Sequence, residues 1–227
     1  MIEGDGRITT GGFTGKIYNL NERLPERCLC IFPNITYHKT NMVYNWEYYS
    51  FESKIPLNIQ DEKCFFNNNY DGNPFKNDLV CCRAEKNIMI FARGRKALYY
   101  FIDHFLEGSD LNLKMKSCSI SVDAFIKQIA KDKTYIITNI SAYYDKAIAD
   151  SLKSLRLYGN DIGSSELFSQ NIGQLSVYRC GIKEITLTEE MISISTDGSL
   201  YINLIIKDLP KINMLFRHLR QNNYLTE

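Results

Sequence analysis

The sequence lacks the features that assign many chains to a class at once. Its 27 Lys and Arg residues are matched by 26 Asp and Glu, and this net charge of +1 argues against a polybasic nucleic-acid coat and an acidic tail. It has no run of about 18 apolar residues, so no membrane-spanning helix and no membrane partner are expected. With 5 prolines and 13 glycines among 227 residues, and 44% apolar residues, it is neither collagen-like nor disordered.

The seven cysteines form no recognisable ligand pattern. Cys28 and Cys30 are one residue apart and Cys81 adjoins Cys82, so neither pair has the two-residue spacer typical of zinc ligands. The first residues are polar and contain no apolar secretory segment. We therefore expect a cytoplasmic protein with reduced, buried thiols, and we predict no metal and no cofactor.

Residues 1–93 are predicted to be a β-rich portion. Aromatic and β-branched residues favour several strands, namely Arg7–Thr10, Thr14–Leu20, Arg27–Phe32, Val43–Phe51, Leu79–Ala84 and Asn87–Ala92. Glu85–Asn87 is typical of a tight hairpin connection. The Asn-rich segment Asn67–Asn77 predicts a loop.

Residues 94–227 are predicted to mix helices and strands. Apolar residues spaced by three and four predict an amphipathic helix over Arg95–Glu107 that ends at Gly108. Beyond it we expect alternating elements, namely a strand over Leu111–Ser119, a helix from Ser121, a strand over Thr134–Ser141 and helices over Asp145–Leu157 and Ser164–Asn171. The two portions are either two domains or one continuous domain.

The C-terminal end predicts a β-hairpin followed by an amphipathic helix. Met191–Ser195 and Leu200–Ile206 alternate in polarity, and Asp197-Gly198 between them favours a type I′ turn. Asp208 is suited to cap the helix, which has a basic face that includes Arg217, His218 and Arg220. The fold class is therefore α+β, with a late hairpin and a C-terminal amphipathic helix.

Two basic segments are candidate anion sites. Lys76–Lys96 contains six basic and two acidic residues, an excess of +4, and its last part places Arg93, Arg95 and Lys96 at a helix N-terminus. Backbone amides and arginine side chains together bind phosphate well. Arg217 and Arg220 lie in a second segment with an excess of +3 (four basic residues and one acidic). An ordinary solvent-facing surface is the favoured interpretation of both segments.

A nuclease is the main enzymatic alternative. Glu52-Ser53-Lys54 and Asp61-Glu62-Lys63 have the acid-x-Lys spacing of metal-dependent phosphodiester cleavage, although this spacing is common by chance. No Gly-x-Ser-x-Gly motif or cysteine-nucleophile signature is present. The chain is therefore more consistent with a protein that is not an enzyme.

The element order from Ile88 to Ile206 is similar to that of accessory proteins of bacterial anti-phage systems, of the RexA and KwaB type. This resemblance rests on the order of strands and helices and identifies no functional residue. It implies a mixed α/β protein that binds DNA or partner proteins. We therefore predict an accessory component that acts through a protein partner or nucleic acid in antiviral defence, and a purely structural interaction module remains a further alternative.

Overall fold

The computed structural model describes residues 12–38, 46–66, 71–84, 86–132, 135–144, 154–184, 192–203 and 209–226. The chain divides into two compact units, Met1–Ser117 and Cys118–Glu227. Both units mix helices with antiparallel strands, and strands dominate, so the protein is broadly α+β. The boundary predicted at residue 93, between a β-rich portion and a portion that mixes helices and strands, falls within the first unit. The predicted strand Arg7–Thr10 and the predicted cap Asp208 lie outside the described residues.

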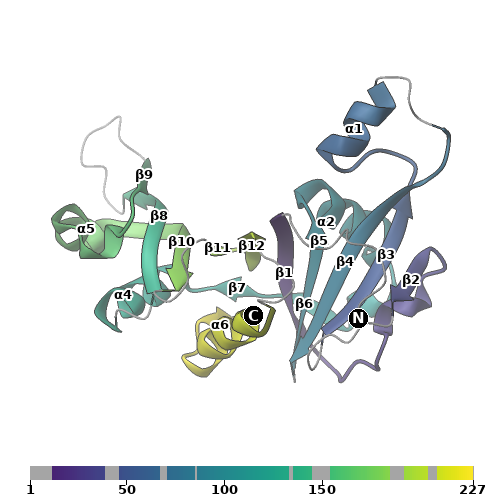
Figure 1. Ribbon diagram of the computed structural model, residues 1–227. Helices are drawn as coiled ribbons and strands as arrows, with labels where there is room; N and C mark the ends of the chain where they lie inside the picture. The colour runs from purple at the N-terminus through teal and green to yellow at the C-terminus, as the bar shows by residue number, and fades with distance from the viewer. Residues whose placement is uncertain are drawn as a thin grey trace. The chain divides into compact units, whose positions relative to one another are not determined.

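The first unit is built on an antiparallel sheet (Figure 1). Its strands follow the order β2-β3-β4-β5-β1-β6. Their bounds are β1 Gly12–Leu20, β2 Ile35–His38, β3 Trp46–Ser53, β4 Phe75–Ala84, β5 Asn87–Arg93 and β6 Met115–Ser117. Because Ala84 pairs directly with Asn87, β4 and β5 form the hairpin predicted from the sequence.

The helices of the first unit correct several predictions. Arg27–Phe32 is not a strand, because Arg27 takes a left-handed conformation (φ 55°) and starts the 3₁₀ helix η1 (Cys28–Ile31). The strand predicted to begin at Leu111 is replaced by α3 (Asp110–Leu113), since the Ser109 side chain accepts a hydrogen bond from the Asn112 amide and caps that turn.

Two further helices of this unit, α1 (Ile59–Phe66) and α2 (Arg95–Phe101), carry residues of the candidate surface site. The predicted helix over 95–107 is present as α2 (Arg95–Phe101) and a π-helical turn (Ile102–Leu106), and Gly108 supplies the positive φ of 76° that follows it. The sequence patterns missed α1 (Ile59–Phe66). The predicted loop at 67–77 ends earlier, because β4 already begins at Phe75, and residues 67–70 lie outside the described ones.

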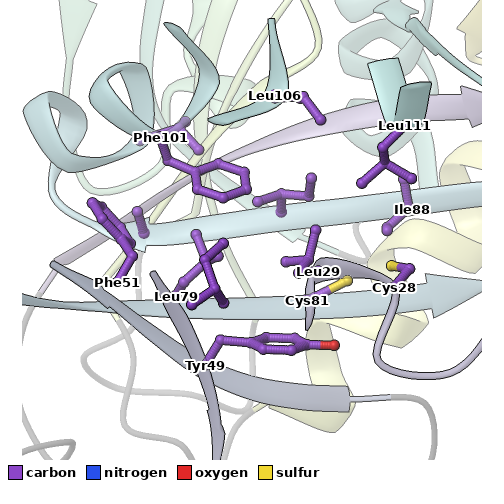
Figure 2. Packing of buried hydrophobic residues seen from close by; sticks show 14 of the residues in the cluster. Cys28, Leu29, Tyr49, Phe51, Leu79, Cys81, Ile88, Phe101, Leu106 and Leu111 are labelled. Atoms are coloured by element: carbon purple, nitrogen blue, oxygen red, sulfur yellow. The ribbon is translucent and has the colours of Figure 1, made fainter. Parts of the chain in front are cut away.

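One face of the sheet carries the core of the first unit (Figure 2). Alternation along β3 sends Tyr49 and Phe51 to this face. The ring of Phe51 lies 5.9 Å from that of Phe101 on α2, and both side chains are fully buried. Aromatic packing of this kind fixes α2 across the strands, and Arg95 and Lys96 are positioned by the same helix.

Gly15 in β1 has no room for a side chain. It pairs with Phe91 of β5, and a Cβ atom at Gly15 would lie 2.1 Å from the Phe91 ring. That ring also packs against Trp46, with centroids 5.9 Å apart. We expect Gly15→Ala to lower the free energy of unfolding by about 1–3 kcal/mol in a urea titration, as overpacking does. The control Gly173→Ala, with nothing within 4 Å, should change it by less than about 0.5 kcal/mol. Equal losses would contradict the close approach.

The second unit combines a second group of antiparallel strands with helices. The strand order is β12-β11-β10-β8-β9, and β7 pairs separately with β13. The strand bounds are β7 Ser119–Ile120, β8 Tyr135–Tyr144, β9 Ser154–Tyr158, β10 Leu175–Glu184, β11 Ile192–Ser195, β12 Ser199–Asn203 and β13 Leu225–Thr226. The helices are α4 Val122–Asp132, η3 Ile162–Ser164, α5 Glu166–Asn171, η4 Ile172–Gln174 and α6 Leu209–Gln221.

Two predictions in this unit were wrong in detail. The last part of the helix predicted over Asp145–Leu157 is instead the start of strand β9, because β9 pairs with β8 from Asn139 to Tyr143. Residues 145–153 lie outside the described ones. The 195–199 turn is not type I′. Gly198 has a positive φ of 75°, but Asp197 is not among the described residues with positive φ. The connection is therefore a three-residue loop with a left-handed glycine.

In the parts of the chain that the structure describes, every helix is too short or too polar to cross a membrane.

Candidate functional site

The helix α1 and the segment just before it carry exposed apolar side chains. Ile55, Phe65 and Phe66 are 52%, 40% and 75% exposed, and we call these three side chains the α1 surface. The rings of Phe65 and Phe66 pack edge to face, with centroids 5.6 Å apart. Neighbouring exposed apolar side chains of this size are typical of interaction sites.

Buried polar contacts fix the chain just before α1. Asn77 donates a hydrogen bond to the Ser53 hydroxyl (3.0 Å), and Ser53 donates one to the Ile55 carbonyl (2.7 Å). At the start of α1, the Asn58 side chain accepts a hydrogen bond from the Asp61 amide (2.9 Å). This is the contact of an N-cap residue, and it defines where α1 begins. The exposure of Ile55 therefore follows from a specific backbone path.

The predicted anion site lies next to α1, and two of its three residues are ion-paired. Arg93 lies 3.7 Å from the Asp78 carboxylate, and Lys96 forms an ion pair with Glu62 of α1. Arg95 is exposed, and its guanidinium lies over the Tyr99 ring, 5.3 Å from the centroid. Asp78 is already included in the excess of +4 counted from the sequence, and Glu62 lowers that excess to +3.

The residues of the nuclease alternative lie on different elements near the same surface. Glu52 is exposed at the end of β3, with Lys54 just after it. Asp61 and Lys63 lie on α1, where the Asp61 carboxylate accepts a hydrogen bond from Asn58 (2.6 Å). Burial raises the pKa of Asp61, while Asn58 and the charge of Arg93 lower it. Among the described residues, no group of close metal ligands includes Glu52 or Asp61.

The second predicted basic face, on α6, is only partly as expected. Arg217 is exposed and Arg220 is half-buried. His218 was expected on the solvent face, but its ring lies 5.9 Å from that of Phe125 and 6.2 Å from that of Tyr224. The solvent-facing basic surface of α6 therefore includes Arg217 but not His218.

A second site is buried inside the first unit. The side chains of Cys28, Glu47 and Cys81 bring one ligand atom each to within 4.8 Å of one another, and all three residues are buried. We call them the thiol cluster. Glu47 and Cys81 are direct partners in the β3–β4 pair. Figure 2 shows the Cys28 and Cys81 sulfur atoms pointing toward one another.

Three donors hold the Glu47 carboxylate. Arg83 donates from Nη2 to Oε1 (3.0 Å), the Arg27 amide donates to Oε1 (2.9 Å), and the Tyr49 hydroxyl donates to Oε2 (2.6 Å). The Glu47 side chain is 8% exposed and that of Arg83 is 22% exposed, so this is a largely buried ion pair. Such a pair needs full hydrogen bonding to offset the loss of hydration.

The environment separates the acidities of the two thiols. A hydrogen bond from Cys81 lowers the pKa of the Cys28 thiol, against the effect of burial. The pKa of Cys81 rises because of that same hydrogen bond and because the residue is completely buried. Cys28 is therefore the thiol that more readily supplies a thiolate.

No local pattern in the sequence marks the thiol cluster. Its residues come from η1, β3 and β4, and only the register of the β3–β4 pair brings Glu47 beside Cys81. The unusual left-handed Arg27 then turns η1 over that position. Sequence motifs for metal sites rely on ligands a few residues apart, so they do not detect three ligands from separate elements.

Comparison with protein-family models and with curated proteins gives no match for this chain.

Proposed function

We propose that the protein is a non-enzymatic binding component that docks a partner protein on the α1 surface. The observation that carries this proposal is the exposure of Phe65 and Phe66 on a helix whose start is fixed by hydrogen bonds, with Ile55 exposed on the segment just before it. Burying an exposed Phe side chain stabilises a complex by about 1.5–3 kcal/mol. Aromatic side chains are also enriched where protein interfaces are buried.

The charges around the α1 surface favour an acidic partner. Among the described residues near this surface, the cations Lys54, Lys63 and Arg95 form no ion pair. They outnumber by one the acids Glu52 and Asp61, which also form none. Two of these cations lie beside the apolar side chains in sequence, and the third is next to Lys96, which is paired with α1. A partner with an apolar pocket and a rim of Asp or Glu would complement this pattern.

The same charges make a protein partner better supported than nucleic acid. Arg93 and Lys96, predicted to bind phosphate, lie beside Asp78 and Glu62. A phosphate backbone would be repelled by these carboxylates, whereas a folded partner can place matching groups against both signs of charge. An accessory role in a bacterial anti-phage system and a cytoplasmic location remain predictions from the sequence.

We expect Phe66→Asp to remove the partner in a quantitative comparison of proteins captured from the native host. Loss of a buried aromatic contact costs about 2 kcal/mol or more, which is roughly 30-fold in affinity. The matched control is Leu113→Asp, because Leu113 is 78% exposed on α3 of the same unit. A protein enriched by the wild type and by Leu113→Asp but absent with Phe66→Asp supports the proposal. Equal capture by both variants contradicts it.

Binding or cleavage of nucleic acid would be the result that opposes the proposed protein docking. If phosphate binding is the main activity, DNA or RNA affinity should fall steeply with salt, and the Arg93→Ala/Arg95→Ala double variant should weaken it. Cleavage of plasmid in the presence of Mg²⁺ would favour the nuclease alternative with Glu52 and Asp61 instead. Either result, together with unchanged protein capture by Phe66→Asp, would replace the proposed function.

A further inference from the structure

The thiol cluster has a set of donor atoms that protein docking does not use. We propose that it binds one divalent cation of the zinc class, held by the sulfur atoms of Cys28 and Cys81 and by one oxygen of Glu47. Two sulfur ligands and one oxygen ligand suit zinc better than magnesium or calcium, which prefer oxygen alone.

The three donor atoms are already close to the spacing that a tetrahedral ion requires. They lie within 4.8 Å of one another. Zinc–sulfur bonds of about 2.3 Å and zinc–oxygen bonds of about 2.0 Å place tetrahedral ligands somewhat less than about 4 Å apart. Small side-chain movements of Cys28 and Cys81 would therefore close the site without moving a strand.

The charges in the cluster balance when the ion is present. Without a metal, the Glu47 carboxylate is paired with Arg83 and the thiols are neutral. A divalent ion replaces the two thiol protons, so that two thiolates and one carboxylate face the ion and one guanidinium. The sum is zero in both states. This matters because an unbalanced charge in a buried site is costly.

The surroundings of Glu47 resemble the outer shell of a metal ligand. An ionised carboxylate has about four lone-pair positions. Three of them accept hydrogen bonds from Arg83, Tyr49 and the Arg27 amide, so one remains for an ion. Outer-shell donors of this kind orient a ligand and keep it ionised.

Neighbouring cysteines define the limits of the site. Cys30 is exposed, and Cys82 is buried and adjoins Cys81, so both lie close in sequence to the thiol cluster. Neither belongs to the group of close ligand atoms. Three protein ligands leave the fourth tetrahedral position to water. An ion bound here would tie η1 to the β3–β4 pair.

The test is a zinc titration of the full-length protein, reduced and stripped of metal, in competition with a chromophoric chelator and with native mass spectrometry as the second readout. We expect one zinc ion per chain and release of about two protons per ion, because Glu47 is already ionised. Cys28→Ser should weaken binding by about 100-fold or more, and Glu47→Gln by about 10-fold or more. Cys30→Ser and Cys82→Ala should bind as the wild type does.

The wild-type measurement decides the matter even if a variant does not fold. Absence of zinc binding by the reduced wild type would overturn the proposal, and so would equal binding by folded Cys28→Ser. A Cys28–Cys81 disulfide in the isolated protein, combined with no zinc binding after reduction, would also overturn it and would identify the pair as a redox site. None of these results bears on the α1 surface, so this proposal and the proposed function can fail separately.

Discussion

Arg83→Ala is expected to lower the free energy of unfolding by about 3 kcal/mol, because it leaves the buried Glu47 carboxylate without its cation. Glu47 would keep the hydrogen bonds from Tyr49 and from the Arg27 amide, but these donors carry no charge. Urea titration of metal-free protein, with a chelator present for both proteins, measures the loss. The exposed pair Lys114–Glu22 provides the control. Lys114→Ala should cost much less than Arg83→Ala, because solvent screens an exposed ion pair. A loss no larger than that of Lys114→Ala would contradict the buried ion pair.

Phe101→Ala is expected to cost about 3–5 kcal/mol in free energy of unfolding, the range for removing a buried aromatic ring. Phe101 is fully buried, and its ring lies 5.8 Å from that of Phe105 and 6.4 Å from that of Phe32. Its removal would leave a cavity between α2 and the sheet. Urea titration again provides the measurement.

The matched control for Phe101→Ala is Phe66→Ala, the same chemical change at a side chain that is 75% exposed. It should alter the free energy of unfolding by less than about 0.5 kcal/mol. Similar losses for the two variants would mean that Phe66 is part of a packed core, and this would remove the basis of the α1 surface. Phe101→Leu should cost less than Phe101→Ala, since it fills most of the cavity.

Periodicity predicted the elements whose apolar faces pack on the core. The helix over 95–107 was found because residues such as Phe101 recur at helical spacing, and the 79–92 hairpin was found because its strands are apolar and joined by a short polar turn. It failed for α1, since Phe65 and Phe66 face solvent and so make no core-facing stripe. It also failed at η1, where a short apolar run has no distinct signature.

The candidate sites depend on contacts between distant segments, and the sequence could predict them only in part. A count of charges found Arg93, Arg95 and Lys96, but Glu62, which pairs with Lys96, lies outside the counted segment. The thiol cluster was missed because Glu47 reaches Cys81 through strand pairing. Exposure of Phe66 likewise follows from how α1 is held and not from its residue type.

Hydrogen exchange of the protein, alone and with its captured partner, tests the docking role of α1 most directly. The proposed function predicts that partner binding slows amide exchange over residues 55–66 and around Arg95. It predicts little change on α6, where the second basic face with Arg217 lies. Protection confined to α6, with α1 exchanging as fast as in the free protein, would contradict it.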